Sequence, residues 1–272
     1  MQTPSFFDFA MENQGGRKSR KFLEEMKAYI PYESLERLLI EEGVYRPRQP
    51  GKAGRPPYPS RVLLGALFLQ TWYGLSDPMT EELIHDRISF RQFLDIKADD
   101  DIPDETTICN FRNAIAKKML FEKIFMIING IMQEQGLILK EGSIVDATTA
   151  KDADIHSLKH LTKEEKAYIV ADSAHMSKAN KQAFRQKGIV NGIIERRVRG
   201  QSKLRAKQQK HNKRFASVRA IVELPFAFIK RLMGYTQTRF IGLEKNDQYH
   251  YLLAAAYNIR RAPNLQRKLE MG

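Results

Sequence analysis

The spacing of apolar residues divides the chain into a helical first half and a second half that contains short strands. Up to about residue 135, apolar side chains recur every three or four positions, as in helices that bury one face. Two such patterns cover residues 18–43, with Pro31 between them. A buried helix is predicted from Ser60 to Tyr73, and short helices follow it up to about residue 96.

The last helical pattern of the first half begins at Glu105. Asp104 stands just before it and can cap the helix, because its side chain can accept a hydrogen bond from a free backbone N–H. Helical spacing then continues to about Gln135, and no strand is predicted before residue 140. The first half is therefore expected to be wholly helical.

After residue 140, the pattern changes to short apolar runs that are typical of buried strands. Two of them, EGSIVDATT and KAYIVADSAH, contain Asp146 and Asp172, and a third run is IVNGIIERR. The helical patterns of this half are MSKANKQAFRQKG, FASVRAIVELPFAFIKRLMG and NDQYHYLLAAAYNIRRAPNL. The alternation predicts an α+β or α/β fold, in which a helical N-terminal domain precedes a short, mostly parallel sheet flanked by helices.

The charge of the chain indicates the class of its partners. Its 45 Lys and Arg residues exceed its 32 Asp and Glu residues, which gives a formal net charge of +13. Such a surplus favours nucleic acid first and an acidic membrane surface second, and a merely basic protein is the plain alternative. The single cysteine, Cys109, excludes an internal disulfide and a cysteine-based zinc site. One cysteine fits a reducing cytoplasm, the N-terminus lacks the pattern of a secretory signal, and no apolar stretch is long enough to span a bilayer. A cytoplasmic, nucleoid-associated protein is therefore expected.

Much of the positive charge lies in one run, residues 196–214, which holds nine Lys or Arg residues and no acid. We expect this run to follow a DNA backbone, since contacts with phosphates give affinity without sequence information. The alternative is a solvated basic loop. The nine residues are Arg196, Arg197, Arg199, Lys203, Arg205, Lys207, Lys210, Lys213 and Arg214.

Asp146 and Asp172 are candidate metal ligands. If their strands are adjacent and parallel, both carboxylates lie at the carboxyl edge of the sheet, where ligands of open α/β sheets bind. Two close carboxylates repel each other unless a cation lies between them, and hard oxygen ligands favour Mg²⁺ or Mn²⁺. Such ions can activate water or a 3′-hydroxyl at a phosphodiester. The alternative is that each Asp only caps a helix or forms a turn.

A later helix carries a third candidate carboxylate. Arg219, Glu223, Phe226 and Lys230 follow one another at intervals of four, three and four residues, so they share one helix face. Glu223 could complete the metal site, while Arg219 and Lys230 could hold DNA phosphates. An exposed helix with salt bridges along its surface is the alternative.

The segment RAIVELPFAFIKRLMGYTQTRFIGLEKN resembles the C-terminal signature of insertion-sequence transposases of the Asp-Asp-Glu (DDE) type, in the "IS-five" group. In that signature, Arg, Glu and Lys are separated by three and then six residues, as Arg219, Glu223 and Lys230 are here. Ala216 stands where the family often has Tyr. The segments IVDAT and VADSAH are similar to those that carry the first two catalytic Asp residues. The segment IPDETTICNFRNAIA resembles part of the family's helical N-terminal domain.

The resemblance, which runs from about Ser5 to Pro263, implies a ribonuclease-H-like domain with Asp146, Asp172 and Glu223 as the catalytic and metal-binding triad. It implies Mg²⁺ or Mn²⁺ as cofactor, cleavage of double-stranded DNA at the terminal inverted repeats of a mobile element, and joining of the 3′ ends to a target. It also implies a homodimer or larger assembly on DNA, with no membrane and no small-molecule substrate.

The chain departs from this family between the first two Asp residues. Family members carry a longer segment there, with the second and third strands of the sheet, whereas Asp172 follows Asp146 by only 26 positions. We hypothesise an internal deletion, which leaves the strand before Asp146 at an edge of the sheet. Three readings stay open: an active transposase, an inactive derivative that binds DNA and regulates the full-length transposase, and a decayed gene product.

The sequence also predicts where the domains begin and end. Residues 1–140 are expected to form a helical domain for DNA binding and dimerisation. Residues 141–240 are expected to form a shortened catalytic domain. Residues 241–272 are expected to form a C-terminal helix that packs on the catalytic domain.

Overall fold

The chain forms two compact units in the computed structural model. The helical unit comprises residues 1–138 and 228–272, and the inserted unit comprises residues 139–227 between them. The structure describes residues 18–48, 51, 55–137, 143–144, 168–170, 178–186, 190–197 and 200–271.

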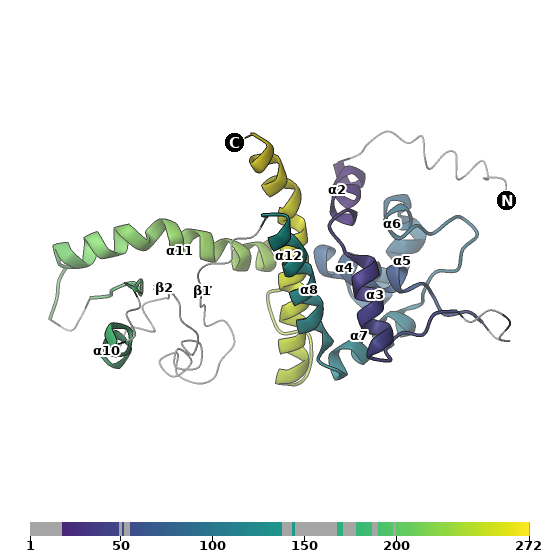
Figure 1. The fold of residues 1–272 in the computed structure, drawn as a ribbon, viewed down its shortest axis with the longest axis horizontal. Helices are drawn as coiled ribbons and strands as arrows, with labels where there is room; N and C mark the ends of the chain where they lie inside the picture. The colour runs from purple at the N-terminus through teal and green to yellow at the C-terminus, as the bar shows by residue number, and fades with distance from the viewer. Residues whose placement is uncertain are drawn as a thin grey trace. The chain divides into compact units, whose positions relative to one another are not determined.

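Helices make up the helical unit, as the spacing of apolar residues predicts (Figure 1). Pro31 separates the first two helices of the described residues. Among the described residues up to 137, no strand is found, in agreement with the sequence. The helices are α2 (Lys18–Lys27), α3 (Tyr32–Glu41), α4 (Ser60–Tyr73), α5 (Asp77–Asp86), α6 (Ile88–Leu94), α7 (Glu105–Lys117), α8 (Leu120–Glu134) and α12 (Leu243–Met271).

Short polar side chains fix where two of these helices begin. The Asp104 carboxylate accepts a hydrogen bond of 2.7 Å from the Thr107 backbone N–H, which confirms the predicted cap of α7. The Ser76 hydroxyl caps α5 in the same way through Met79 N–H. The predicted helical stretch from residue 105 to 135 is in fact two helices, because Met119 adopts a left-handed φ of 56° between α7 and α8.

The core of the helical unit is built around α4, whose residues from Val62 to Trp72 are all buried. The Trp72 ring stacks on Phe68 at 5.6 Å between ring centroids, and its Nε1–H donates to the Ala256 carbonyl of α12 at 2.9 Å. Burial of so many aliphatic and aromatic side chains is the main stabilising contribution to such a unit.

The C-terminal helix α12 belongs to this core. It packs along α8 and also meets α2, α4 and α7, so its position in the helical unit differs from the expected packing on the catalytic domain. The physical reason is its apolar face, on which Leu252, Leu253 and Ile259 are at most 2% exposed. A face of this kind needs an apolar partner, and the first helices supply one.

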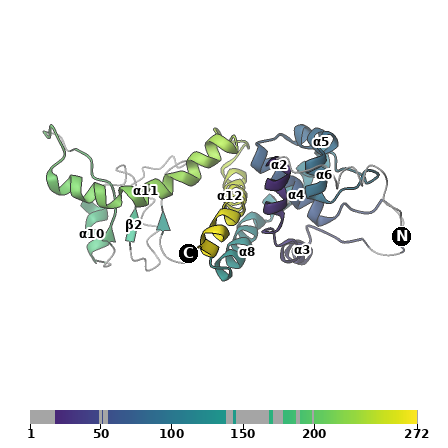
Figure 2. The same cartoon turned by 90° about the horizontal axis from the view of Figure 1, so that it is seen from above.

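The described residues of the inserted unit form a short parallel sheet with two helices. Its strands are β1 (Ser143–Ile144), β2 (Tyr168–Val170) and β3 (Val190–Asn191), in the spatial order β1-β2-β3. All three lie in the apolar runs that the sequence identified as strands. The helices are α10 (Lys178–Gln186), which packs against β3, and α11 (Ala206–Leu232); Figure 2 labels α10, β2 and α11.

Helix α11 begins earlier than the sequence predicted. It starts at Ala206, whereas the apolar spacing indicated Phe215. Residues 206–214 lack Gly, Pro and β-branched side chains, so they favour helix although they carry no apolar stripe. The Gln208 side chain accepts a hydrogen bond from Arg205 N–H at 2.8 Å, which stabilises this first turn. The second half of the basic run is therefore helical rather than a loop.

Candidate functional site

Parallel strands lead into the two candidate Asp residues. β1 and β2 are neighbours, with Ile144 paired to Val170, which is the adjacent and parallel arrangement that the sequence analysis required. Asp146 and Asp172 each follow their paired residue by two positions. Both Asp residues lie outside the described residues, so their carboxylates are not placed.

The Asn212 side chain fixes the first half of α11 by hydrogen bonds to the backbone of Glu195. Asn212 Oδ1 accepts a hydrogen bond from Glu195 N–H at 2.8 Å, and Asn212 Nδ2 donates to the Glu195 carbonyl at 2.9 Å. The neighbouring His211 ring lies 2.9 Å from the Ile193 carbonyl through Nε2. Through these contacts, the segment that follows β3 satisfies its backbone groups on α11 instead of on another strand.

The same contacts set the rotation of α11 about its axis. His211, Asn212 and the buried Phe215 lie at helical spacing and mark the face that meets the segment after β3. Glu223 follows Asn212 by eleven residues, or about three turns at roughly 3.6 residues per turn, so both positions lie on one face of α11. The backbone of Arg219 and Glu223 is helical, and their side chains lie outside what the structure describes.

An ion pair joins α10 to the same segment. Lys181 Nζ lies 2.6 Å from Glu195 Oε1, and the hydrogen bond from Lys181 holds the pKa of the Glu195 carboxyl below its usual value. Glu195 thus contacts α10 with its side chain and α11 with its backbone. Sequence reasoning assigned no role to Lys181, Glu195 or Asn212, and the only signal for Asn212 is its helical spacing from Glu223.

Nearly all of the predicted basic residues can be located. Gly200, with a φ of 90°, turns the chain before α11, and Lys207, Lys210 and Lys213 project from the helix. Among the described members of the run, none forms an ion pair with a carboxylate, so their charge is available to a polyanion. Arg199 lies outside the described residues. The exposed residues are Arg196, Arg197, Lys203, Arg205, Lys207, Lys210, Lys213 and Arg214.

Lys230 is also exposed, but it lies in the last turns of α11, which belong to the helical unit. The structure therefore shows the predicted Arg219–Glu223–Lys230 row along one continuous helix. Of these three side chains, only that of Lys230 is described. Within the described part of the chain, no three His, Cys, Asp or Glu residues are grouped as metal ligands would be. No helix of that part is long and apolar enough to cross a membrane.

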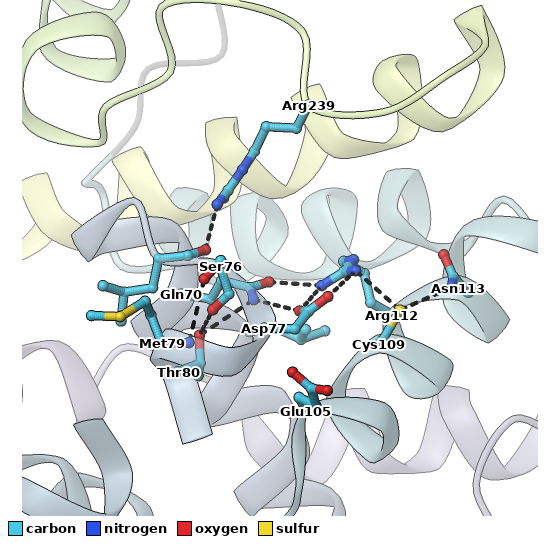
Figure 3. Close-up of polar contacts among 12 residues, drawn as sticks. Gln70, Ser76, Asp77, Met79, Thr80, Glu105, Cys109, Arg112, Asn113 and Arg239 are labelled. Atoms are coloured by element: carbon cyan, nitrogen blue, oxygen red, sulfur yellow. Dashed lines mark hydrogen bonds and ion pairs between the residues drawn. The ribbon is translucent and has the colours of Figure 1, made fainter. Parts of the chain in front are cut away.

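A second polar cluster, in the helical unit, was not predicted (Figure 3). Arg112 Nη2 lies 2.8 Å from Asp77 Oδ2, and Gln70 Oε1 accepts from Arg112 Nη1 at 3.0 Å. Burial works to raise the pKa of Asp77, but hydrogen bonds from Arg112 and Gln70 outweigh it and hold that pKa below its usual value. Because its polar groups largely bind one another, this cluster ties α4, α5 and α7 together and serves the fold.

The segment that leads from α11 to α12 contacts the end of α4, close to this cluster. Arg239 donates to the Leu75 carbonyl and to the Tyr249 hydroxyl, the latter at 3.1 Å. Gly74, with a φ of 64°, ends α4 where the backbone of Met233 passes so close that a β-carbon would lie 2.8 Å from its carbonyl oxygen. Only glycine fits this position without a shift of the backbone.

Comparison with known proteins gives two family matches. Residues 12–114 match the model of the Transposase domain (DUF772), and residues 137–259 match the model of the Transposase DDE domain. No solved structure matches the chain. The matches agree with the resemblance of both halves, and the DDE domain implies a ribonuclease-H-like fold and a divalent metal ion.

Proposed function

We propose that this chain, which carries the two domains of a DDE transposase of an insertion sequence, binds the ends of its element and cuts and joins DNA there. The observation that carries the proposal is the parallel pairing of Ile144 with Val170. Asp146 and Asp172 follow these residues at the same offset, which favours two carboxylates at one edge of the sheet.

The phase of α11 supports Glu223 as the third carboxylate. Asn212 lies on the face of α11 that meets the segment after β3, and Glu223 lies on the same face about three turns later. Three carboxylates form the donor set that Mg²⁺ or Mn²⁺ prefers. When bound, such an ion supplies positive charge at the scissile phosphate and at the leaving oxygen.

The basic residues have a separate role in this proposal. The exposed cations of residues 196–214 hold the phosphates of the duplex, and Arg219 and Lys230 steady the DNA or Glu223 itself. Contacts of this kind act on any sequence, and each releases about one counterion from the DNA. A homodimer or larger assembly on paired element ends remains part of the proposal.

A second candidate function rests on the edge position of β1. Within the described residues, β1 has a single neighbour, β2, as expected if an internal deletion removed the strands beyond it. Catalytic geometry tolerates little looseness. Under this alternative, the chain is an inactive derivative of an "IS-five" transposase that binds element ends, pairs with the full-length protein and inhibits it.

Strand cleavage distinguishes the two functions. The purified protein is mixed with a duplex that carries the terminal repeat of the parent element, with and without Mg²⁺, and Asp146→Asn is the matched variant. Mg²⁺-dependent cleavage by the wild type that is lost in Asp146→Asn is the expected result. Retarded but uncut duplex, from protein whose folding is verified by circular dichroism, would contradict the catalytic proposal and support the inactive derivative.

A further inference from the structure

Two large apolar side chains are exposed on the turn that leads into α12. Ile241 is 99% exposed and Leu243 is 85% exposed, which are the highest values for large hydrophobic side chains in the described residues. Only Gly242 lies between them, with a left-handed φ of 99° that favours glycine. The chain itself therefore brings the two side chains together at one sharp turn.

A buried side chain holds this turn in shape. Asn246, which is 8% exposed, donates through Nδ2 to the Phe240 carbonyl at 2.6 Å and to the Gly242 carbonyl at 2.7 Å. Its Oδ1 accepts a hydrogen bond from Phe240 N–H at 3.2 Å. These bonds hold the backbone on both sides of Ile241. Single exposed apolar residues are common on proteins, but here a buried amide fixes the backbone that presents a pair of them.

The residues before the turn are anchored to the helical unit. The Phe240 ring lies 5.2 Å from that of Tyr249, measured between centroids, and Arg239 donates to the Leu75 carbonyl and to the Tyr249 hydroxyl. Phe240 packs against the apolar core, whereas neither of the two exposed side chains does. The anchored residues thus present a rigid apolar tip, formed by Ile241 and Leu243, to the surroundings.

The size and the charge of this region favour DNA over a protein as its partner. A stable protein interface buries about 1,200–2,000 Å² in total, far more than two side chains on one turn supply. Between residues 230 and 245, the chain has one acid, Glu244, and four cations, which are Lys230, Arg231, Arg239 and Lys245. Ile or Leu side chains near cations are what DNA-bending proteins insert between base pairs.

We propose that Ile241 and Leu243 form a wedge that inserts between adjacent base pairs of the bound duplex and partly unstacks them. The neighbouring cations hold the phosphates beside the distorted step. Pyrimidine–purine steps unstack most easily, so insertion is expected there. This inference rests on the proposed function, since it takes DNA as the partner. It adds a distortion of the duplex that requires no catalytic carboxylate.

The test measures unstacking and affinity in the same samples. The full chain is bound, without Mg²⁺, to a duplex that carries the terminal repeat of the parent element, and permanganate oxidises the unstacked thymines. The wild type is expected to increase reactivity at a pyrimidine–purine step. The double variant Ile241→Ser, Leu243→Ser should lose this signal and bind roughly tenfold more weakly. Its slope of log K against log salt should equal that of the wild type, because no cation is lost.

Leu269→Ser is the matched control. Leu269 lies near the end of α12 and is 55% exposed, so the same kind of substitution is made at another exposed apolar side chain. It should leave both thymine reactivity and affinity unchanged. Thermal unfolding of the double variant should match that of the wild type. A lower melting temperature would show that Ile241 and Leu243 pack against the protein, which contradicts a free wedge.

The remaining outcomes separate the wedge from the proposed function. Wild-type reactivity and affinity in the double variant would overturn the wedge and leave the proposed function standing. Absence of duplex binding by the folded wild type would overturn both. Sedimentation without DNA tests the other occupant: if the wild type is a dimer and the double variant is a monomer, the tip binds a second copy of the chain and the assignment to DNA is wrong.

Discussion

The helical unit and the inserted unit are each stabilised by a different kind of interaction. In the described chain, the large apolar core from Leu23 to Ala262 belongs wholly to the helical unit. In its described residues, the inserted unit shows short strands and a few buried side chains, such as Phe184 and Ile193, and hydrogen bonds of Asn212 and His211 fix α11. The stability of the helical unit depends on buried apolar area, and that of the inserted unit depends on particular polar contacts. Mutations should therefore affect the two units separately.

The largest effect is expected from Trp72→Ala. Trp72 is 2% exposed, and its removal leaves a large cavity and deletes the hydrogen bond to the Ala256 carbonyl, which should lower the free energy of unfolding by about 3–5 kcal/mol. Chemical denaturation measures this loss. Ile241→Ala, at a side chain that is 99% exposed, should change stability by less than about 0.5 kcal/mol. Similar losses in the two variants would contradict a core built around α4.

Arg112→Ala should come next, with a loss of about 3 kcal/mol. The substitution leaves the mostly buried Asp77 carboxylate without its cation, which is costlier than the pair is worth. Asp77→Asn combined with Arg112→Ala should recover part of the loss, because no unpaired charge then remains. Denaturation of the two single variants and the double variant measures this coupling. A double variant as unstable as the sum of the single ones would show that the pair does not act as a unit.

A smaller effect is expected where the chain returns to the helical unit. Gly74→Ala combines a left-handed φ with a β-carbon 2.8 Å from the Met233 carbonyl oxygen. Gly136→Ala shares the left-handed φ of 70° but meets open space, so it serves as the control for strain alone. We expect about 1–2 kcal/mol for Gly136→Ala and at least about 1 kcal/mol more for Gly74→Ala. Equal melting temperatures would mean that the close approach to Met233 has no energetic weight.

Asn212→Ala should affect the inserted unit alone. It removes two side-chain hydrogen bonds and leaves the backbone N–H and carbonyl of Glu195 without them, a local cost of about 1–3 kcal/mol. Hydrogen exchange should accelerate in residues 192–197 and in the first half of α11, while protection of α4 stays unchanged. Lys213→Ala, at an exposed neighbour on the same helix, should leave both regions as they are. Faster exchange in α4 would show that the two units do not respond separately.

The smallest expected effect is on the stability of the fold at acidic pH. Because Arg112 and Gln70 hold the pKa of Asp77 below its unfolded value of about 3.9, the ionised carboxylate stabilises the folded state at higher pH. That contribution is complete above the unfolded pKa and is lost as pH falls through the folded pKa. Asp77→Asn should therefore show a weaker dependence of unfolding free energy on pH below about 4 than the wild type. Parallel curves would exclude Asp77 as a source of acid sensitivity.

The sequence predicts helices and strands well where the spacing of apolar residues or a single capping residue determines them. Apolar spacing located the helices of the first half, Asp104 marked the start of α7, and short apolar runs located three strands. The start of α11 was missed, because a polar helix without an apolar stripe resembles a loop. Backbone propensity alone carried that information.

Contacts between distant segments were beyond the sequence. An apolar face on α12 is visible in the sequence, but the identity of its partner depends on packing in three dimensions. Arg112 and Asp77 meet across 35 positions with no periodic signal between them. For the candidate site, the pairing of β1 with β2 confirms the arrangement of strands that the argument needed, whereas the triad itself stays a prediction.

The insertion of residues 139–227 into the helical unit has a consequence for synthesis. The ribosome makes every segment that carries a candidate carboxylate before it makes α12, which closes the helical core. Domains usually fold from the N-terminus as the chain emerges, but this core cannot close until α12 has left the ribosomal exit tunnel. An mRNA truncated after the codon for residue 242 would yield a protein that has all three candidate carboxylates but lacks α12 from its helical core. The helical core therefore forms only in chains whose synthesis has passed α12.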